Sequence, residues 1–190
     1  MRLPSEPISL PVLPYSYDGL TPVISVDQLK THYSGHHRTY VETYNRLLQD
    51  KSNSEDHIVN LEFNFFGHLL HSLFWQNLTT QHSTKPTGKF LAQLNSQSSV
   101  EKLFKDIIVS AGNIHGSGWI VVAADNRNNE IVISTISNHD IGDLLNYRPL
   151  LVLDAWEHSY YIDYKNKKNL FFESLLTVVN WDVVERRFIK

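Results

Sequence analysis

Two long stretches of helical periodicity lie close together in the first half of the chain and constrain its fold most strongly. Apolar and aromatic residues recur every three or four positions over residues 27–50 and again over residues 57–78. Only a short polar loop separates them, which favours two antiparallel helices. Ser34 and Gly35 weaken the first helix near its start and favour a kink there. The pattern predicts a helical hairpin, preceded by an extended arm over residues 1–26.

The second half of the chain has a different periodicity. Residues 118–125 (GWIVVAAD) and 130–137 (EIVISTIS) flank a turn rich in asparagine, a pattern typical of a β-hairpin. Residues 149–153 (PLLVL) predict a third, buried strand. Helical patterns occupy residues 89–113 and continue from 155 to 190. Strands and helices are therefore mixed in this half, whereas the first half is helical throughout.

These patterns predict an α+β protein in two domains. We expect an N-terminal arm and helical hairpin domain over residues 1–82, and a C-terminal α/β domain over residues 88–190 that contains the β-hairpin and the third strand. The stretch TTQHSTKPTG, at residues 79–88, is the clearest linker in the chain.

Composition excludes several classes of function. The chain of 190 residues has no cysteine, which rules out disulfides, thiolate metal sites and a cysteine nucleophile. Its formal net charge is −3 and it has no basic stretch, so we expect no nucleic-acid partner. No apolar run reaches the roughly 18 residues that a membrane span needs, and the start has no apolar leader segment. We therefore expect a cytoplasmic protein with no membrane partner.

Ten histidines are the unusual feature of the composition, and most of the interesting ones fall in three motifs. The motifs are HYSGHHRTY with His32, His36, His37 and Tyr40, GHLLHSLFW with His68 and His71, and DAWEH with Asp154 and His158. His32, His36 and Tyr40 are four residues apart and share one helix face. Histidine and carboxylate ligands without thiolates suit iron, manganese or zinc, and three histidines with one aspartate leave a position open for water or substrate.

Each motif also has a plain structural interpretation. A single helical histidine is most often an ordinary core or surface residue. Asp154 follows a predicted strand, and its spacing to Glu157 resembles a capping box, although that box prefers Ser or Thr as the cap. Taken together, the three motifs favour a catalytic metal site with an open position.

Five motifs in this order resemble the iron/manganese superoxide dismutase family: HYSGHHRTYVETYN, GHLLHSLFW, GSGW, DAWEHSYY and VVNWD. The opening LPVLPYSYDGLTPVIS resembles the N-terminal arm of that family, and the resemblance extends from about Leu10 to Phe188. The family fold that the resemblance implies is a helical hairpin domain followed by an α/β domain with a three-stranded antiparallel sheet, with the metal between the two domains. This agrees with the organisation predicted above.

The resemblance implies four protein ligands, two from each domain: His32, His71, Asp154 and His158. It implies one iron or manganese ion per subunit, or either of the two, with a bound water or hydroxide as fifth ligand. The implied reaction converts two superoxide anions into dioxygen and hydrogen peroxide, while the metal alternates between its trivalent and divalent states. Zinc has no redox chemistry and could not serve.

The resemblance also assigns residues around the open position. Tyr40 is the expected gateway, whose phenol donates a hydrogen bond and relays a proton, and His36 is its expected neighbour. His139, in SNHD, is expected to hydrogen-bond the metal-bound solvent, a position that is often Gln in the family. Iron forms commonly place a Gln on the second helix instead, at the position that Gly67 occupies here.

Other residues are expected at a subunit interface or around the metal. Glu157 is expected to contact the metal-ligating histidine of a neighbouring subunit, and Tyr161 to bond His36 of that subunit, in a homodimer that could assemble further into a tetramer. Trp119 and Trp156 resemble the aromatic shell that packs the site. Plain core packing and a local cap remain the alternative roles of these residues.

The sequence departs from the family pattern at four positions. Val121 and Leu70 replace a frequent Trp and a frequent Asn, and Phe66 replaces a small residue beside Gly67. Lys168 replaces an Arg that supports the substrate funnel, and it lacks the planar fork of a guanidinium. We expect the metal ligands to be unaffected. Substrate steering, proton supply and dimer strength are the properties that these changes put in question. Phe66 could crowd the space near the residue that hydrogen-bonds the metal-bound solvent, and so shift the metal preference.

Three other functions remain possible from the residues alone. A mononuclear non-haem iron oxygenase would use two histidines and a carboxylate, but the third histidine argues against it. A zinc hydrolase fits the ligand types, yet no positioned general base stands out. A non-catalytic protein with the same fold would be indicated by loss of a ligand, and all four are present.

Overall fold

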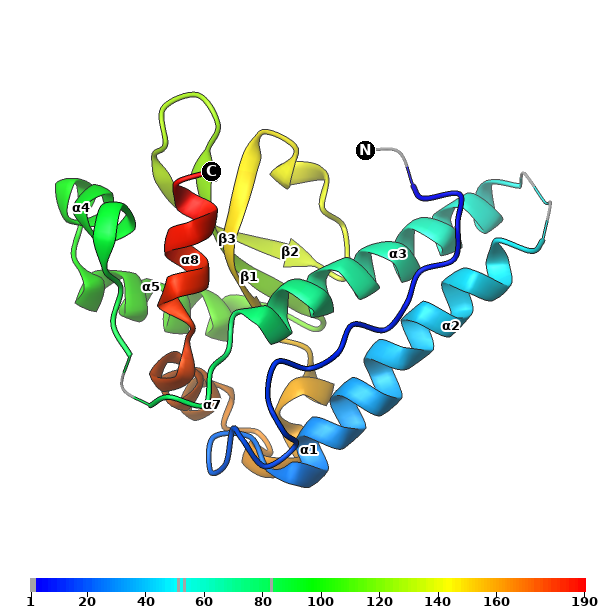
Figure 1. Ribbon diagram of the computed structural model, residues 1–190, viewed down its shortest axis with the longest axis horizontal. Helices are drawn as coiled ribbons and strands as arrows, with labels where there is room; N and C mark the ends of the chain where they lie inside the picture. The colour runs from blue at the N-terminus through cyan, green and yellow to red at the C-terminus, as the bar shows by residue number, and fades with distance from the viewer. Residues whose placement is uncertain (1–2, 51, 53, 83) are drawn as a thin grey trace.

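The computed structural model describes residues 3–50, 52, 54–82 and 84–190, and it contains the predicted helical hairpin followed by an α/β half (Figure 1). The helices of the first half are α1 (Val26–Lys30), a π-helical segment η1 (Thr31–His37), α2 (Arg38–Leu47) and α3 (Glu55–Gln76). In Figure 1, α2 and α3 lie side by side as two long antiparallel arms.

The helix boundaries follow from hydroxyl caps. Ser25 caps the first helix, because its Oγ accepts a hydrogen bond of 3.1 Å from Gln28 N, and the helix therefore begins at Val26. Ser54 caps α3 in the same way through His57 N, so α3 begins two residues earlier than predicted. The predicted weak point near Gly35 is a π-helical segment, a form that is frequent at functional sites.

Side chains of the hairpin hold the N-terminal arm in place by hydrogen bonds to the main chain of the arm. Asn45 on α2 makes two bonds of 2.8 Å with the main chain of Ile8. The Tyr44 hydroxyl donates to Pro4 O and the Tyr33 hydroxyl to Pro11 O, both at 2.6 Å. The arm has no helix or strand over residues 3–24, so η1 and α2 supply partners for its main chain.

The second half contains the predicted sheet together with the remaining helices. The strands are β1 (Gly118–Asp125), β2 (Ile131–Ser137) and β3 (Tyr147–Asp154). The helices are α4 (Gly88–Gln97), α5 (Val100–Asn113), α6 (Tyr161–Tyr164), α7 (Lys168–Leu175) and α8 (Trp181–Phe188), with short 3-10 turns η2 (Gly142–Leu144), η3 (Glu157–Ser159) and η4 (Leu176–Val178). The α+β fold class predicted from the sequence is confirmed.

The sheet is antiparallel with strand order β2-β1-β3. Every residue of β1 is buried, as expected for a central strand that is covered on both faces. The third strand is longer than the predicted 149–153, because pairing with β1 continues to Tyr147 at one end and to Asp154, opposite Trp119, at the other. Asp154 is thus the last residue of a buried strand, pointing toward the hairpin.

Asn77, just after α3, joins the two halves of the molecule through hydrogen bonds of its side chain to β3. Its Nδ2 donates to Leu150 O at 3.1 Å, and its Oδ1 accepts from Val152 N at 3.0 Å. Arg187 on α8 donates to the same Asn77 Oδ1 at 3.0 Å. These bonds satisfy buried polar groups and fix the end of α3 against β3. They therefore set the distance between residues on these two elements.

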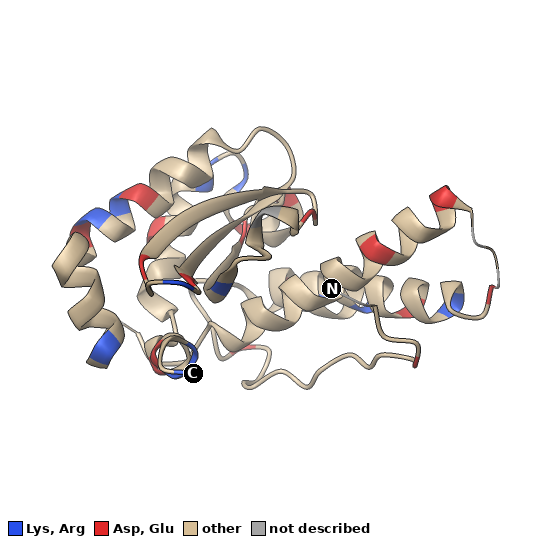
Figure 2. Ribbon diagram, turned by 90° about the horizontal axis from the view of Figure 1, so that it is seen from above, with Lys and Arg blue, Asp and Glu red and all other residues tan. Residues whose placement is uncertain are grey.

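Charged residues of both signs are interspersed over the surface (Figure 2). On α5, for example, Lys102 and Asp106 form an ion pair of 2.6 Å. Over the part of the chain that is described, no helix has both the length and the apolar character that crossing a membrane requires. The division into domains at residues 1–82 and 88–190 stays a prediction.

Candidate metal centre

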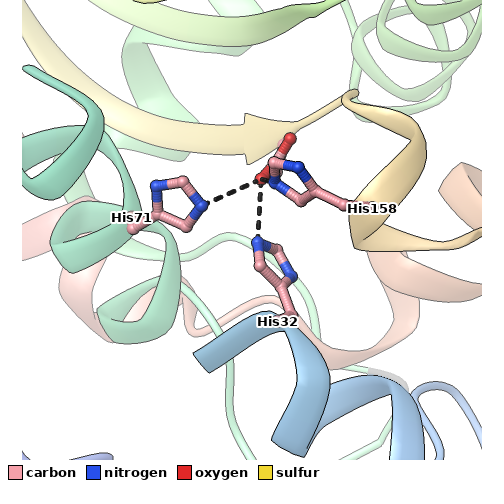
Figure 3. A group of neighbouring side chains, drawn as sticks. His32, His71 and His158 are labelled. Carbon is pink, nitrogen blue, oxygen red and sulfur yellow. Dashed lines mark ion pairs between the residues drawn. The ribbon is translucent and has the colours of Figure 1, made fainter. Parts of the chain in front are cut away.

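Three imidazoles and one carboxylate converge between the hairpin and the sheet (Figure 3). Asp154 Oδ2 lies 3.0 Å from His32 Nε2, 3.3 Å from His158 Nε2 and 3.6 Å from His71 Nε2. One ligand atom from each of the four residues lies within 4.8 Å of all the others. Residues far apart in the sequence thus form one compact group.

Each of the four side chains is placed by a different element. His32 projects from η1 and His71 from the C-terminal part of α3, whereas Asp154 ends β3 and His158 lies in the turn η3. His71 Nδ1 donates a hydrogen bond of 2.6 Å to Gly67 O, one helical turn earlier. This bond fixes the tautomer and leaves the Nε2 lone pair free toward the other three residues.

The converging atoms are buried and have no hydrogen-bond partner. This holds for Nε2 of the three histidines and for Asp154 Oδ2, because the short distances between them lack the alignment of a hydrogen bond. Buried polar atoms are nearly always paired, so a cluster of unpaired ones indicates a missing partner. Three nitrogen donors and one carboxylate oxygen suit iron or manganese, and the residues present fit such an ion.

The protonation states of the group also suit a cation. Burial lowers the pKa of His32 to about 4, although the Asp154 carboxylate raises it. Burial lowers the pKa of His71 well below its usual value as well. For Asp154, burial alone raises the pKa, but the nearby His158 and His32 lower it, and the net shift is downward. At neutral pH the imidazoles of His32 and His71 are therefore neutral, and Asp154 is a negative carboxylate.

The second oxygen of Asp154 explains why a local cap was a reasonable interpretation of this motif. Oδ1 accepts a hydrogen bond of 2.8 Å from Trp156 N, which secures the turn after β3. Oδ2 faces the imidazoles. The predicted capping box is not formed, because the residue that caps η3 is Trp156 and no side chain caps this turn. The bond at Oδ1 instead orients Oδ2.

Tyr40 and His139 lie together beside His71. The ring of Tyr40 is 4.9 Å from that of His139 and 5.2 Å from that of His71, measured between centroids. Trp119 Nε1 donates to His139 Nδ1 at 3.1 Å, so the neutral ring carries its proton on Nε2, which is buried without a partner. Burial lowers the pKa of His139 to about 4. His139 therefore holds an unused N–H donor next to Tyr40.

Three further side chains with aromatic rings pack on the ligand group: His36, Trp156 and Trp119. His36 stacks on His158 with ring centroids 4.1 Å apart, and Trp156 stacks between His158 at 5.3 Å and His139 at 4.8 Å. Trp119 contacts His71 edge-on at 4.9 Å. The aromatic residues predicted around the site are thus brought to it.

Gly67 provides the space that Tyr40 and His139 occupy. A Cβ at this position would lie 2.9 Å from the Tyr40 ring and 3.1 Å from His139 Cδ2. Phe66, which was expected to crowd this region, instead packs its ring on Phe65 at 5.4 Å. The close packing around His139 therefore depends on the absence of a side chain at Gly67, and not on Phe66. The effect of Phe66 on metal preference stays a prediction.

The remaining predicted residues lie at the surface near the centre. Glu157 is exposed and, within the described residues, its side chain makes no hydrogen bond or ion pair. Tyr161 is 47% exposed. Lys168 Nζ donates to Ala111 O at 3.4 Å and to Ile114 O at 3.2 Å, so it binds the carbonyl end of α5.

Two contacts of the centre were not predicted from the sequence. Phe63 covers His139, with ring centroids 4.7 Å apart, and Trp75 lies 4.7 Å from the His32 ring. Both residues are four positions away from a residue of the site, Phe63 before Gly67 and Trp75 after His71. The four-residue spacing that identified the first helix would have found them on the second.

Two other histidines, His37 and His68, lie near His71 but outside the group of four ligand residues. Trp75 Nε1 donates to His37 Nδ1 at 2.9 Å, and His37 Nε2 lies 2.9 Å from His68 Nδ1. His37 also stacks on His71, with ring centroids 5.2 Å apart. His37 therefore packs against a member of the centre without joining it, and His68 packs on His37.

The fold is a helical hairpin followed by an α/β half, and a buried group of three histidines and one aspartate lies between them. These features define a class of proteins with one such His-Asp metal site per chain. Residues 8–79 match the family described as iron/manganese superoxide dismutases, alpha-hairpin domain, and residues 86–187 match its C-terminal domain. The chain therefore belongs to the iron/manganese superoxide dismutase family, a family of oxidoreductases.

Individual relatives agree with this assignment. The superoxide dismutase [Fe] of Methanothermobacter thermautotrophicus is 37% identical over 191 residues, covering 94% of this chain and 93% of the relative. The superoxide dismutase [Mn] of Chlamydia trachomatis is 33% identical, covering 95% of each chain. The superoxide dismutase [Fe] of Mycobacterium tuberculosis is 35% identical, covering 95% of this chain and 92% of the relative. Both metals occur among the names of these relatives.

Proposed function

We propose that this chain dismutates superoxide at a single iron or manganese ion held by four side chains: His32, His71, Asp154 and His158. The observation that carries the proposal is the group of four buried ligand atoms that lack hydrogen-bond partners and lie within 4.8 Å of one another. Family membership supports the reaction, and it argues against the oxygenase and hydrolase alternatives.

The bound ion supplies a one-electron redox couple, through which one superoxide is oxidised to dioxygen and another is reduced to hydrogen peroxide. The three imidazoles and the Asp154 carboxylate would hold the ion, and the negative carboxylate would offset part of its charge. His71 is oriented for this role by its bond to Gly67 O. The aromatic enclosure of Trp119, Trp156 and Phe63 limits the access of water and of molecules larger than superoxide.

Proton supply is the role we assign to Tyr40, His139 and His36. Peroxide formation consumes two protons, so donors must lie close to the substrate. Burial raises the pKa of Tyr40, with a further contribution from the Asp154 charge, so its phenol stays protonated at neutral pH. His139 keeps an N–H on Nε2 that can hold a metal-bound solvent molecule. His36 is half-buried against His158, between the centre and the surface.

A homodimer is the assembly that we propose. A concavity of about 780 Å³ lies at the surface, and its lining includes Glu157, Tyr161, Lys168 and Leu170. Apolar side chains around it are partly exposed, with Tyr161 at 47% and Leu170 at 45%. A second copy of the chain, related by a two-fold axis, could place its Glu157 near His158 of the first. Assembly into a tetramer is also open.

Sedimentation analysis tests this assembly. We expect the purified chain to sediment as a dimer, and Leu170→Glu to weaken that dimer. A chain that stays monomeric at micromolar concentration would contradict the proposal. A cytoplasmic location, expected from the sequence, also stays a proposal, and fractionation of the cells that make the protein tests it.

The choice of metal is tested by reconstitution. The metal-free protein is loaded separately with iron and with manganese, and superoxide dismutation is measured for each form at known metal content. Activity in one form alone identifies the metal in use, and similar activity in both means that either ion serves. Inactivity of both forms, each with one ion per chain, would contradict the proposed function and favour a non-catalytic role.

A further inference from the structure

Gln28 is a buried polar side chain at the junction of the two halves. It lies on α1, one helical turn before His32, and only 1% of it is exposed. A buried amide needs hydrogen-bond partners, and those of Gln28 come from the other half of the molecule. The environment of this residue is therefore set by contacts between the halves.

Both ends of the Gln28 amide bond to the segment that carries His158. Gln28 Nε2 donates a hydrogen bond of 2.6 Å to His158 O. Ile162 N donates one of 3.1 Å to Gln28 Oε1. One side chain thus holds the main chain of His158 itself and of the following helix α6.

The internal hydrogen bonds of the segment around His158 do not involve the main chain of His158. In the three-residue turn η3, Ser159 N donates to Trp156 O at 3.0 Å and Tyr160 N donates to Glu157 O at 3.1 Å. Ser159 Oγ donates to Asp154 O at 3.1 Å and to Trp156 O at 2.8 Å. No side chain other than Gln28, within the described residues, hydrogen-bonds the main chain of His158. Contacts from outside the turn are needed to fix its direction relative to the hairpin.

Two further bonds join the same two segments without reaching His158. Ser25 N donates to Asp163 Oδ2 at 2.8 Å, and the Tyr164 hydroxyl donates to Val23 O at 2.8 Å. They attach α6 to the residues before and at the start of α1. They provide a natural comparison for Gln28, because they stabilise the same contact between the halves.

We infer that Gln28 is a positioning residue that sets His158 against His32. Gln28 on α1 and His32 on the adjoining η1 both contact His158: Gln28 binds its main chain, and the centroid of the His32 ring lies 4.8 Å from that of the His158 ring. Residues four apart share a helix face, so this pair fixes both the position and the direction of the His158 side chain. The inference rests on the proposal that His32 and His158 hold the same ion.

Gln28→Met tests this role, because methionine keeps the length of the side chain and a good helix propensity but cannot bond His158 O or Ile162 N. We expect the manganese-loaded variant to release its metal to a chelator about 10-fold faster than the unaltered protein, as for other residues that orient ligands. We also expect a shift in the visible absorption band of the trivalent manganese form, which reports ligand geometry.

Tyr164→Phe is the matched control. It removes the bond to Val23 O and loosens the same contact between the halves, but it leaves the main chain of His158 untouched. We expect it to lower the melting temperature while the metal release rate and the absorption band stay as in the unaltered protein. Equal release rates and bands for Gln28→Met and the unaltered protein would overturn the inference, as would equal changes in both variants.

Amide hydrogen exchange on the unaltered protein tests the same role if Gln28→Met does not fold. We expect the Ile162 amide to be protected equally with and without metal, because Gln28 holds it in both states. An Ile162 amide that is protected only after metal binding would overturn the inference. Failure of the proposed function is distinguishable, since the unaltered protein would then bind no manganese or bind it without activity.

Discussion

Asp154 Oδ2 lies 3.0 Å from His32 Nε2, and both atoms are buried without a hydrogen-bond partner. One belongs to the last residue of β3 and the other to the first long helical stretch of the hairpin. An ion bound by both therefore links the two halves of the molecule. Loss of either ligand should affect metal content and thermal stability together.

Asp154→Asn tests the ligand role. We expect metal affinity to fall by at least about 100-fold, since even supporting residues of a metal site cost up to that factor. Dismutation should fall in proportion to metal content. Metal analysis and activity assays on the same samples check both expectations.

The metal-free form of this variant is its own control. The amide that replaces the carboxylate keeps an oxygen that can accept from Trp156 N, so the turn after β3 should remain intact. The melting temperature of the metal-free variant should therefore stay close to that of the metal-free unaltered protein. A full complement of bound metal in Asp154→Asn would show that the ligand assignment is wrong.

Gly67→Ala tests the close packing of Tyr40 and His139. Alanine in place of glycine inside a helix normally stabilises by about 0.5–1 kcal/mol. Here the added Cβ would lie 2.9 Å from the Tyr40 ring, and overpacking of this kind costs about 1–3 kcal/mol. We expect a net loss of about 1 kcal/mol in denaturant unfolding, and lower activity because both rings must move.

Gly35→Ala is the comparison, since an added Cβ at Gly35 has no neighbour within 4 Å. This variant should be as stable as the unaltered protein or gain about 0.5 kcal/mol, with unchanged activity. If Gly67→Ala behaved like Gly35→Ala, the space beside Gly67 would not constrain the site.

The site could be predicted from the sequence where spacing along one element sufficed. The step of four residues placed His32, His36 and Tyr40 on one face, and the structure brings all three to the centre. The same step on α3 would have added Phe63 and Trp75. What spacing cannot give is the register between elements from different halves, which depends on contacts such as those of Asn77 with β3.

Asp125→Asn tests a charge contact outside the site. Asp125 Oδ1 accepts from Arg127 N and Nε, and Oδ2 accepts from Nη2 at 2.6 Å. These bonds to Arg127 lower the pKa of Asp125 to about 2. A folded-state pKa below the unfolded value of about 3.9 means that the stabilisation is complete above about pH 4 and is lost as the pH falls toward 2.

Thermal unfolding of the metal-free protein as a function of pH checks this expectation. Asp125→Asn should melt at a lower temperature than the unaltered protein at pH 7, and the difference should shrink between about pH 4 and pH 2. A difference that stays constant over this range would mean that the Asp125 charge is not the cause.

Lys168→Met tests which role this residue has. Its ammonium binds carbonyl oxygens at the end of α5, where a positive charge stabilises a helix by about 0.3–1 kcal/mol. We expect a loss of about 0.5 kcal/mol in stability, with a small effect on activity. Lys167→Met is the control. It removes a positive charge at the neighbouring position, from an exposed side chain, and should leave the stability unchanged.

A role in steering superoxide would give a different result. Both variants would then lower the activity at low ionic strength, and the difference from the unaltered protein would vanish at high salt. Stability loss confined to Lys168→Met, without that salt effect, supports the helix-end role seen in the structure.

The fold class could be predicted because the two halves of the sequence differ in periodicity. The exact ends of the helices and strands could not be predicted. Strand β3 extends past the predicted 149–153 because its partner β1 continues to pair with it. Helix α3 begins earlier because Ser54 caps it. Gln28 carried no signal in the sequence, since a single polar residue on a helix is ordinary until its partners across the fold are known.

The most direct test of the account compares redox-active and redox-inactive ions in the same centre. Superoxide consumption is measured for the protein carrying one manganese or iron ion per chain, and for the protein carrying one zinc ion per chain. The account predicts rapid consumption with manganese, iron or both, and none above background with zinc, which has no redox couple. Equal consumption by the zinc form, or none by either redox-active form at full occupancy, would contradict it.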